Sequence, residues 1–228
     1  MKRVLAYFSP FEWGLLLSSV AVSLLSELLS GGGGALSLAA SVVGAFALMF
    51  TAKGNPLGQL LFIAFGTLYG IISYTYAYYG EMITYLGMSV PMAVISLVSW
   101  LRHPNGKKRS EVRVGGLCRP DAVLLPTLSV AVTVLFYFVL RYFGTANLLP
   151  STLSVTTSFA AVYLTFRRSP FYAFAYAIND LVLILLWSLA ALTDPSYLAV
   201  IVCFVMFLVN DSYGFINWRR MKRKQQRM

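Results

Sequence analysis

The sequence predicts an all-α polytopic membrane protein with about eight transmembrane helices. Hydrophobic residues make up 58% of the 228 residues and charged residues only 11%, a composition too apolar for a soluble domain. Apolar runs of about 18 or more residues recur along the whole chain, as expected for membrane-spanning helices. Lys and Arg lie mainly between these runs, so the net charge of +10 is explained by membrane orientation and needs no nucleic-acid partner.

Eight apolar runs can be placed in order, each bounded by Gly, Pro, Asn or charged residues. Pro56 begins one run, because proline is tolerated in the first helical turn, and Pro91 is expected to kink another. The expected spans are 13–29, 35–51, 56–78, 81–101, 122–142, 150–166, 170–192 and 196–218.

The connections between the runs alternate in charge. If every run crosses the membrane once, the N-terminus, Lys53, the polar segment 102–121, the Arg167-Arg168 pair and the basic tail fall on one side. The other side has only Arg141, at a helix end. Because Lys and Arg favour the cytoplasmic side, both termini are predicted to be cytoplasmic.

Two segments share the pattern Thr-x-basic-x-x-Pro, one at 51–56 and one at 165–170. Each begins in a span rich in small residues, and each following three-span unit ends near a tryptophan, Trp100 or Trp218. We interpret this as two parallel three-helix repeats, a transporter plan that places the substrate between the halves near the midplane; the alternative is a chance match. The predicted divisions are an N-terminal helix and turn (1–34), a first repeat (35–101), a basic loop and linker helix (102–149), a second repeat (150–218) and a basic tail (219–228).

Two of the apolar runs each contain an Asn-Asp pair, Asn179-Asp180 and Asn210-Asp211. A carboxylate inside an apolar run is costly in a bilayer, so it usually faces a cavity or a partner. The alternative is that each pair only forms hydrogen bonds to neighbouring helices.

Helical spacing gathers aromatic and polar side chains on several faces. Tyr176, Asp180 and Trp187 share one face of the span 170–192, and Tyr69 lies deep in the span 56–78. Aromatic planes mixed with amides and carboxylates suit a flat aromatic solute with a hydroxylated, possibly cationic part. The expected substrate-binding residues are Gln59, Tyr69, Tyr176, Asn179, Asp180, Trp187 and Asn210.

Metal and enzyme chemistry are not expected. His103 is the single histidine and lies beside a basic loop, whereas a histidine metal site or a catalytic triad needs several partners. Cys118 and Cys203 are interpreted as free thiols. An enzyme acting on lipid would need a nucleophile and a base at membrane depth, and the sequence has no clear pair. The protein is therefore not expected to be an enzyme or to bind a cofactor, and a receptor or subunit that moves nothing remains an alternative to a transporter.

Four stretches resemble the PnuC-type nicotinamide riboside transporter family: TAKGNP (51–56), LYGIISYTYAYYGEM (68–82), AINDLVLILLW (177–187) and FLVNDSYGFINWRR (207–220). The resemblance covers about residues 37–218. It implies parallel three-helix halves joined by a linker helix, as in an enlarged SWEET fold, often assembled as a homotrimer in the lipid of the bacterial plasma membrane. It also implies uptake by facilitated diffusion, with the substrate trapped in the cell by a cytosolic kinase.

One departure from the family pattern concerns the substrate. Better-known riboside transporters have a Trp- and Gln-bearing stretch entering the helix that resembles the span 170–192, whereas residues 171–176 here read FYAFAY. Thiamine or riboflavin uptake on the same scaffold is therefore an alternative. For nicotinamide riboside we expect Tyr69, Tyr176 and Trp187 to stack on the ring, and the ribose or amide to be held by Gln59, Asn179, Asp180 and Asn210.

Overall fold

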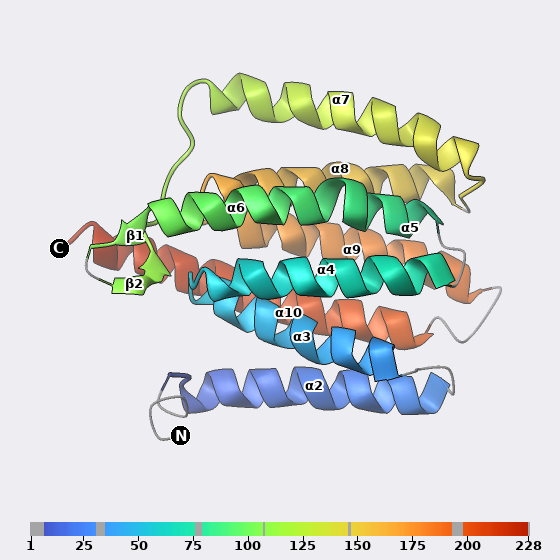
Figure 1. Ribbon diagram of the computed structural model, residues 1–228, viewed down its shortest axis with the longest axis horizontal. Coiled ribbons are helices and arrows are strands. Elements are labelled where there is room, and N and C mark those ends of the chain that lie inside the picture. The colour runs from blue at the N-terminus through green and yellow to red at the C-terminus, as the bar shows by residue number, and fades with distance from the viewer. Residues whose placement is uncertain are drawn as a thin grey trace.

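The computed structural model describes residues 7–30, 35–75, 79–106, 108–145, 147–192 and 198–227. These residues form long helices that lie side by side in one bundle (Figure 1), as the sequence predicted. The π-helical turn η1 (Tyr85–Ser89) joins α5 and α6 into one continuous helix. The helices are α2 (Pro10–Ser30), α3 (Ala35–Ala52), α4 (Leu57–Thr75), α5 (Tyr79–Thr84), α6 (Val90–Arg102), α7 (Asp121–Tyr142), α8 (Leu148–Phe166), α9 (Tyr172–Ala191) and α10 (Leu198–Gln225).

Within the described residues, six helices are long and apolar enough to cross a membrane: α4, the α5–α6 helix, α7, α8, α9 and α10. The described apolar stretches of α2 and α3 are shorter, Pro10–Ser26 and Leu38–Ala52. Large apolar side chains such as Val123, Leu135 and Phe138 are exposed along α7, as expected for a surface that contacts lipid tails. The protein is thus a multi-pass membrane protein.

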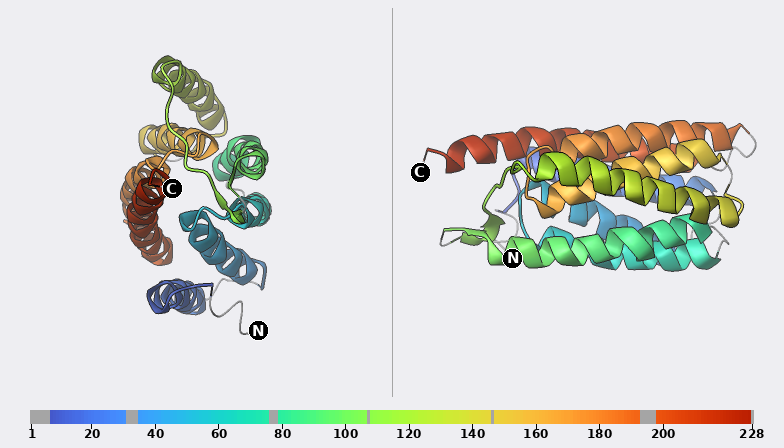
Figure 2. Two further views of the ribbon diagram at one scale, coloured as in Figure 1. Left: turned by 90° about the vertical axis from the view of Figure 1, so that its left-hand side faces the viewer. Right: turned by 90° about the horizontal axis from the view of Figure 1, so that it is seen from above.

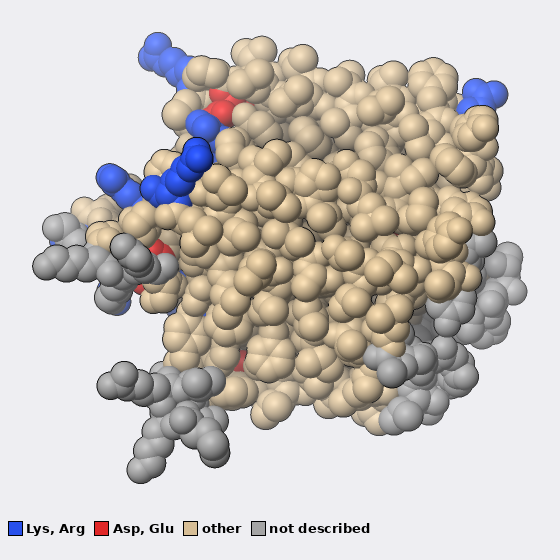
Figure 3. Space-filling model, in the orientation of Figure 1, with Lys and Arg blue, Asp and Glu red and all other residues tan. Residues whose placement is uncertain are grey.

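Lys and Arg gather at one end of the bundle, while the side of the molecule between the two ends is almost free of charge (Figure 3). We call this end, where α6 and α8 finish and α7 starts, the basic end, and the other end the distal end. In the described chain, Arg141 is the basic residue near the distal end. The charge separation has the pattern expected for a membrane protein, and the assignment of the basic end to the cytoplasm stays a prediction.

The two Thr-x-basic-x-x-Pro segments fold into matching turns at the basic end. Gly54 and Arg168 both have left-handed backbone angles, with φ of +66° and +55°. Gly54 N donates to Thr51 O and Arg168 N donates to Thr165 O, both at 2.9 Å. Each turn closes the last carbonyls of a helix in the manner of a C-terminal cap.

Each matching turn is also tied by an ion pair to the helix that precedes its unit. Lys53 Nζ lies 2.8 Å from Glu12 Oε2 on α2, and Arg167 Nη2 lies 2.7 Å from Asp121 Oδ2 on α7. The two helices flank the bundle on opposite sides (Figure 2). These matched contacts support an internal repeat, while the division of the chain into domains stays a prediction.

The loop after α6 departs from the sequence expectation, which predicted only a polar segment at 102–121. It contains a short antiparallel hairpin of β1 (Pro104–Asn105) and β2 (Lys108–Val112). Val112 is fully buried, and its N donates to Gly54 O at 2.8 Å. Three residues later, Gly115 N donates to Arg168 O at 2.9 Å. We call residues 110–116 the strap, because they connect the two matching turns.

Helix α10 continues seven residues beyond the expected end at 218, because its Lys and Arg residues are good helix formers and its end is anchored to the strap. Gln225 Nε2 donates to Val112 O at 3.1 Å, and Gln225 Oε1 accepts from Val114 N at 2.8 Å. The predicted basic tail is therefore mostly helical.

Glycines bring α4 against the α5–α6 helix. A Cβ at Gly70 would lie 2.6 Å from Leu86 Cγ, and one at Gly66 would lie 2.8 Å from Val90 Cγ2. The sequence predicted a kink at Pro91, and the π-helical turn η1 ends just before this proline. Because proline has no N–H, one helix carbonyl lacks its usual partner, which favours such a wide turn. The close approach places Tyr85 and Ser89 of η1 beside α4.

Candidate functional site

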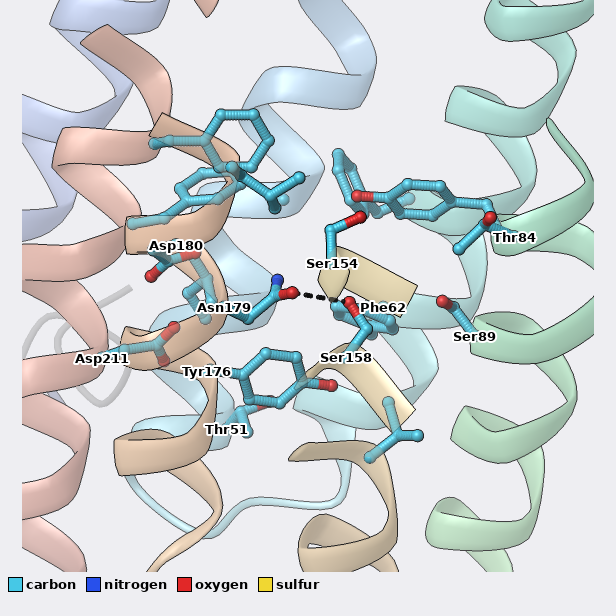
Figure 4. A pocket seen from close by; sticks show the side chains of 18 of the residues that line it. Thr51, Phe62, Thr84, Ser89, Ser154, Ser158, Tyr176, Asn179, Asp180 and Asp211 are labelled. Atoms are coloured by element: carbon cyan, nitrogen blue, oxygen red, sulfur yellow. Dashed lines mark hydrogen bonds between the residues drawn. The ribbon is translucent and has the colours of Figure 1, made fainter. Parts of the chain in front are cut away.

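A cavity lies in the middle of the bundle, with side chains from α3, α4, the α5–α6 helix, α8, α9 and α10 around it (Figure 4). Its volume is about 80 Å³, which is less than a drug-sized solute needs. A wider chamber of about 560 Å³ continues toward the distal end, and Glu81, Thr84 and Ser154 line both spaces. A solute arriving through the chamber would therefore have to widen the central cavity.

The central cavity is lined by acidic residues. Glu81, Asp180 and Asp211 line it, and among its described lining residues there is no Lys, Arg or His. Asp180 and Asp211 are 3% and 5% exposed, and their carboxyl groups lie side by side (Figure 4). Two carboxylates at one site repel each other, so the pair favours a state in which they hold one proton between them. Asp180 Oδ2 is buried and has no hydrogen-bond partner in the described chain, so it is available to a donor or a cation.

The amide of Asn179 is held in one orientation by α8. Its Oδ1 accepts from Thr157 Oγ1 at 2.8 Å. It also accepts from Ser158 Oγ at 2.9 Å (Figure 4). Because the amide oxygen is occupied by two hydroxyl donors, the Nδ2 group is the part that remains to donate to a solute. Asn179 is thus a preorganised donor in the wall of the cavity.

Aromatic rings supply most of the remaining wall. The Tyr172 and Tyr176 rings on α9 make an edge contact with centroids 6.2 Å apart. The Tyr176 hydroxyl forms a hydrogen bond with the Thr165 side chain at the end of α8. Flat rings beside carboxyl groups favour an aromatic solute that carries positive charge. The aromatic lining residues are Phe62, Phe65, Tyr85, Tyr172, Tyr176, Phe204 and Phe207.

Four of the seven residues predicted to bind substrate line the central cavity: Gln59, Tyr176, Asn179 and Asp180. Trp187 lines the distal chamber instead. Tyr69 is not among the residues that line either space; its ring packs 4.5 Å from that of Tyr85, which does line the cavity.

Asn210 faces a different neighbour. Its Nδ2 donates to Ser19 Oγ on α2 at 2.9 Å and to Met206 O at 2.8 Å. The next residue, Asp211, lines the cavity, because one step along a helix turns a side chain by about 100°. For Asn210, the alternative reading of a hydrogen bond to a neighbouring helix therefore matches the structure.

Many lining residues were outside the predicted set, and four of the polar ones show which sequence signals existed. Asp211 belongs to the second Asn-Asp pair, so its signal was present. Glu81 lies at the start of the expected span 81–101, where a charged side chain can reach water. Ser154 and Ser158 lie in a span rich in small residues, which entered the sequence argument only as evidence for the internal repeat.

Comparisons with known proteins agree in sequence and in fold. The family model described as nicotinamide mononucleotide transporter matches residues 34–220. The nicotinamide riboside transporter PnuC of Neisseria mucosa is 26% identical over 193 residues, which cover 83% of this chain and 73% of that protein. A crystal structure of the vitamin B3 transporter PnuC superposes with a TM-score of 0.79 at 26% identity, covering 96% of this chain and 94% of the other.

Proposed function

Because the chain belongs to the nicotinamide mononucleotide transporter family, we propose that it carries nicotinamide riboside, the nucleoside without the phosphate, into the cell. The protein is a membrane transporter and not an enzyme. The family description and the name of the Neisseria mucosa relative point to different solutes, a nucleotide and a nucleoside. The charge of the cavity supports the nucleoside.

The observation that carries the proposal is an acidic cavity with no basic lining residue in the described chain. The pyridinium ring of nicotinamide riboside bears a permanent positive charge, which carboxyl groups attract. The mononucleotide adds a phosphate with a charge of about −1.5 to −2. Phosphate sites are normally built from Arg, Lys or the N–H groups of helix N-termini. Glu81, Asp180 and Asp211 would repel that group instead.

Each lining residue has a proposed role. Tyr176 stacks on the pyridinium ring, and Asp180 with Asp211 balances its charge. The Nδ2 of Asn179 and the amide of Gln59 bind the ribose hydroxyls or the carboxamide. Tyr69 supports Tyr85, Asn210 fixes the register of α10, and Trp187 meets the solute in the distal chamber.

Direction and assembly follow from the basic end and the family resemblance. With the basic end and both termini in the cytoplasm of a bacterial cell, the distal chamber faces the outside. The solute enters through the chamber by facilitated diffusion, and a cytosolic kinase traps it. A homotrimer surrounded by lipid is the proposed assembly.

Thiamine and riboflavin remain as alternative solutes, because Tyr172 and Tyr176 stand where the Trp- and Gln-bearing stretch of better-known riboside transporters is expected. Thiamine is also an aromatic cation, so the acidic cavity would attract it as well. The choice between these solutes depends on direct competition.

The test is uptake of labelled nicotinamide riboside into proteoliposomes of the purified protein. Unlabelled riboside should compete fully, while the mononucleotide, thiamine and riboflavin should not. The combined Asn179→Ala and Asp180→Ala variant should lose uptake. Survival of uptake in this variant would refute the site assignment. Competition by the mononucleotide would refute the charge argument. Uptake of thiamine or riboflavin alone would assign that vitamin, and not the riboside, as the transported solute. No uptake of any solute would favour a receptor that moves nothing.

A further inference from the structure

Two tryptophans meet at the basic end of the central cavity. Trp100, near the end of α6, and Trp218, on α10, are both 0% exposed. Their ring centroids are 5.3 Å apart. The ring of Tyr172, which lines the cavity, makes an edge contact with Trp218 at 4.8 Å. The tryptophan pair therefore lies directly between the cavity and the basic end.

Both indoles form the same hydrogen bond to the opposite side of the bundle. Trp100 Nε1 donates to Thr165 O at the end of α8, and Trp218 Nε1 donates to Thr51 O at the end of α3, both at 2.9 Å. The residues just before them repeat the pattern. Ser99 Oγ donates to Phe166 O at 3.0 Å, and Asn217 Nδ2 donates to Ala52 O at 2.9 Å. Four bonds thus join residues 99–100 of α6 and 217–218 of α10 to the two matching turns.

The acceptors of the two indole bonds are suited to repeated breaking. Thr51 O also accepts from Gly54 N, and Thr165 O also accepts from Arg168 N. When an indole leaves, its acceptor carbonyl keeps one partner and is not left buried without a bond, which would be costly. The indole N–H would then meet water if the basic end opened.

The cavity is connected to this seal through Thr165. The hydroxyl of Tyr176, in the cavity wall, bonds to the Thr165 side chain, and the Thr165 carbonyl binds Trp100. On the outer side, buried Val112 of the strap packs in the same apolar cluster as both tryptophans. The seal therefore contacts both the cavity and the strap.

We propose that Trp100 and Trp218 form the cytoplasmic gate of the transport pathway and that their two reciprocal bonds break together when the solute leaves. The proposal rests on the proposed function, because it takes the central cavity as the substrate path and the basic end as cytoplasmic. The distal chamber is wide while the tryptophan pair is closed, as expected for a pathway that opens at one end at a time.

The gate can be tested without any substrate by cysteine labelling. Cys118→Ser and Cys203→Ser give a cysteine-free chain, and Leu48→Cys then places a reporter in the wall of the central cavity. A small thiol reagent with a trimethylammonium group, which cannot cross the membrane, is applied separately to each side of oriented vesicles. The reporter should react from the distal side and be protected from the basic side.

Trp100→Phe or Trp218→Phe removes one indole donor and should raise labelling from the basic side about fivefold, and both together about 30-fold, since one hydrogen bond has a net strength of about 1 kcal/mol. Trp13→Phe on α2 is the matched control and should change nothing. Ser99→Ala with Asn217→Ala is a milder pair that should also raise labelling. If both pairs keep the reporter protected while each retains distal labelling, the gate assignment is wrong. Because no riboside is present, failure of riboside uptake does not affect this readout.

Discussion

The carboxyl group of Asp121 anchors α7 to the second matching turn, and its removal should measurably destabilise the protein. Asp121 is 3% exposed. Its Oδ2 accepts from Arg167 Nη2 at 2.7 Å, Arg167 Nε at 3.0 Å and Cys118 N at 2.6 Å, and its Oδ1 accepts from Tyr163 Oη at 2.7 Å. The perturbation we consider is Asp121→Asn, which keeps the shape and removes the charge.

The expected loss follows from this geometry. Breaking a buried ion pair costs about 3–5 kcal/mol. The Arg167 side chain is 29% exposed, so its guanidinium can turn partly to water and the cost falls to about 2–3 kcal/mol. For a chain of this size each kcal/mol lowers Tm by about 2–4 °C, so Tm should fall by about 4–12 °C. Thermal unfolding of the detergent-solubilised protein measures it.

A double-mutant cycle separates the ion pair from other effects. Asp121→Asn and Arg167→Gln should be non-additive by about 1–2 kcal/mol. Glu12→Gln, which breaks the matching pair with Lys53, should resemble Asp121→Asn. Glu111→Gln in the hairpin should change stability by about 0.5 kcal/mol or less, because a Gln oxygen can still accept the bonds from Asn105 Nδ2 and Gln225 Nε2. A Tm decrease below about 2 °C for Asp121→Asn, or additive effects in the cycle, would refute the reasoning.

Three further predictions concern the cavity and its walls. Asp211→Asn should raise the KM for the cationic riboside by about tenfold and leave the binding of a neutral nucleoside unchanged, because it removes an acidic lining group; competition uptake assays measure both, and equal effects would contradict it. Asn179→Leu should abolish uptake and lower stability by about 1–3 kcal/mol, since Ser158 loses its acceptor and Thr157 keeps only the carbonyls of Leu153 and Ser154; normal uptake would contradict the assigned role. Gly70→Val should destabilise by about 1–3 kcal/mol through its clash with Leu86, seen as a lower Tm, whereas Gly14→Ala, where a Cβ meets nothing within 4 Å, should not.

Much of the fold could be predicted because long apolar runs fix where membrane helices lie. The charge of the connections also separates the basic end from the distal end. Asp180 was identified because a carboxylate inside such a run is costly in lipid and therefore faces a cavity or a partner. These signals depend on composition averaged over many residues, so they can be recognised without knowing which helices pack against each other.

The sequence could not predict which of two adjacent helical residues faces the cavity, because one step along a helix turns the side chain by about 100°. Asn210 and Asp211 are adjacent, and the apolar residues around them give no strong face, so the sequence cannot tell which one meets the cavity. The contacts of Trp100 and Trp218 were hidden for another reason. Their acceptors are backbone carbonyls, which every residue carries, so no side-chain pattern marks them.

The acidic cavity also has an electrical consequence. Asp180 and Asp211 belong to helices and stay behind when a solute leaves, so their charge does not travel with it. Each cationic riboside that crosses therefore carries one positive charge through the membrane. A potential of 100 mV, negative inside, is worth about 2.3 kcal/mol per charge, which corresponds to a concentration ratio of about 50. Passive carriage of this cation would thus be enough to accumulate it, with the cell's own voltage as the driving force.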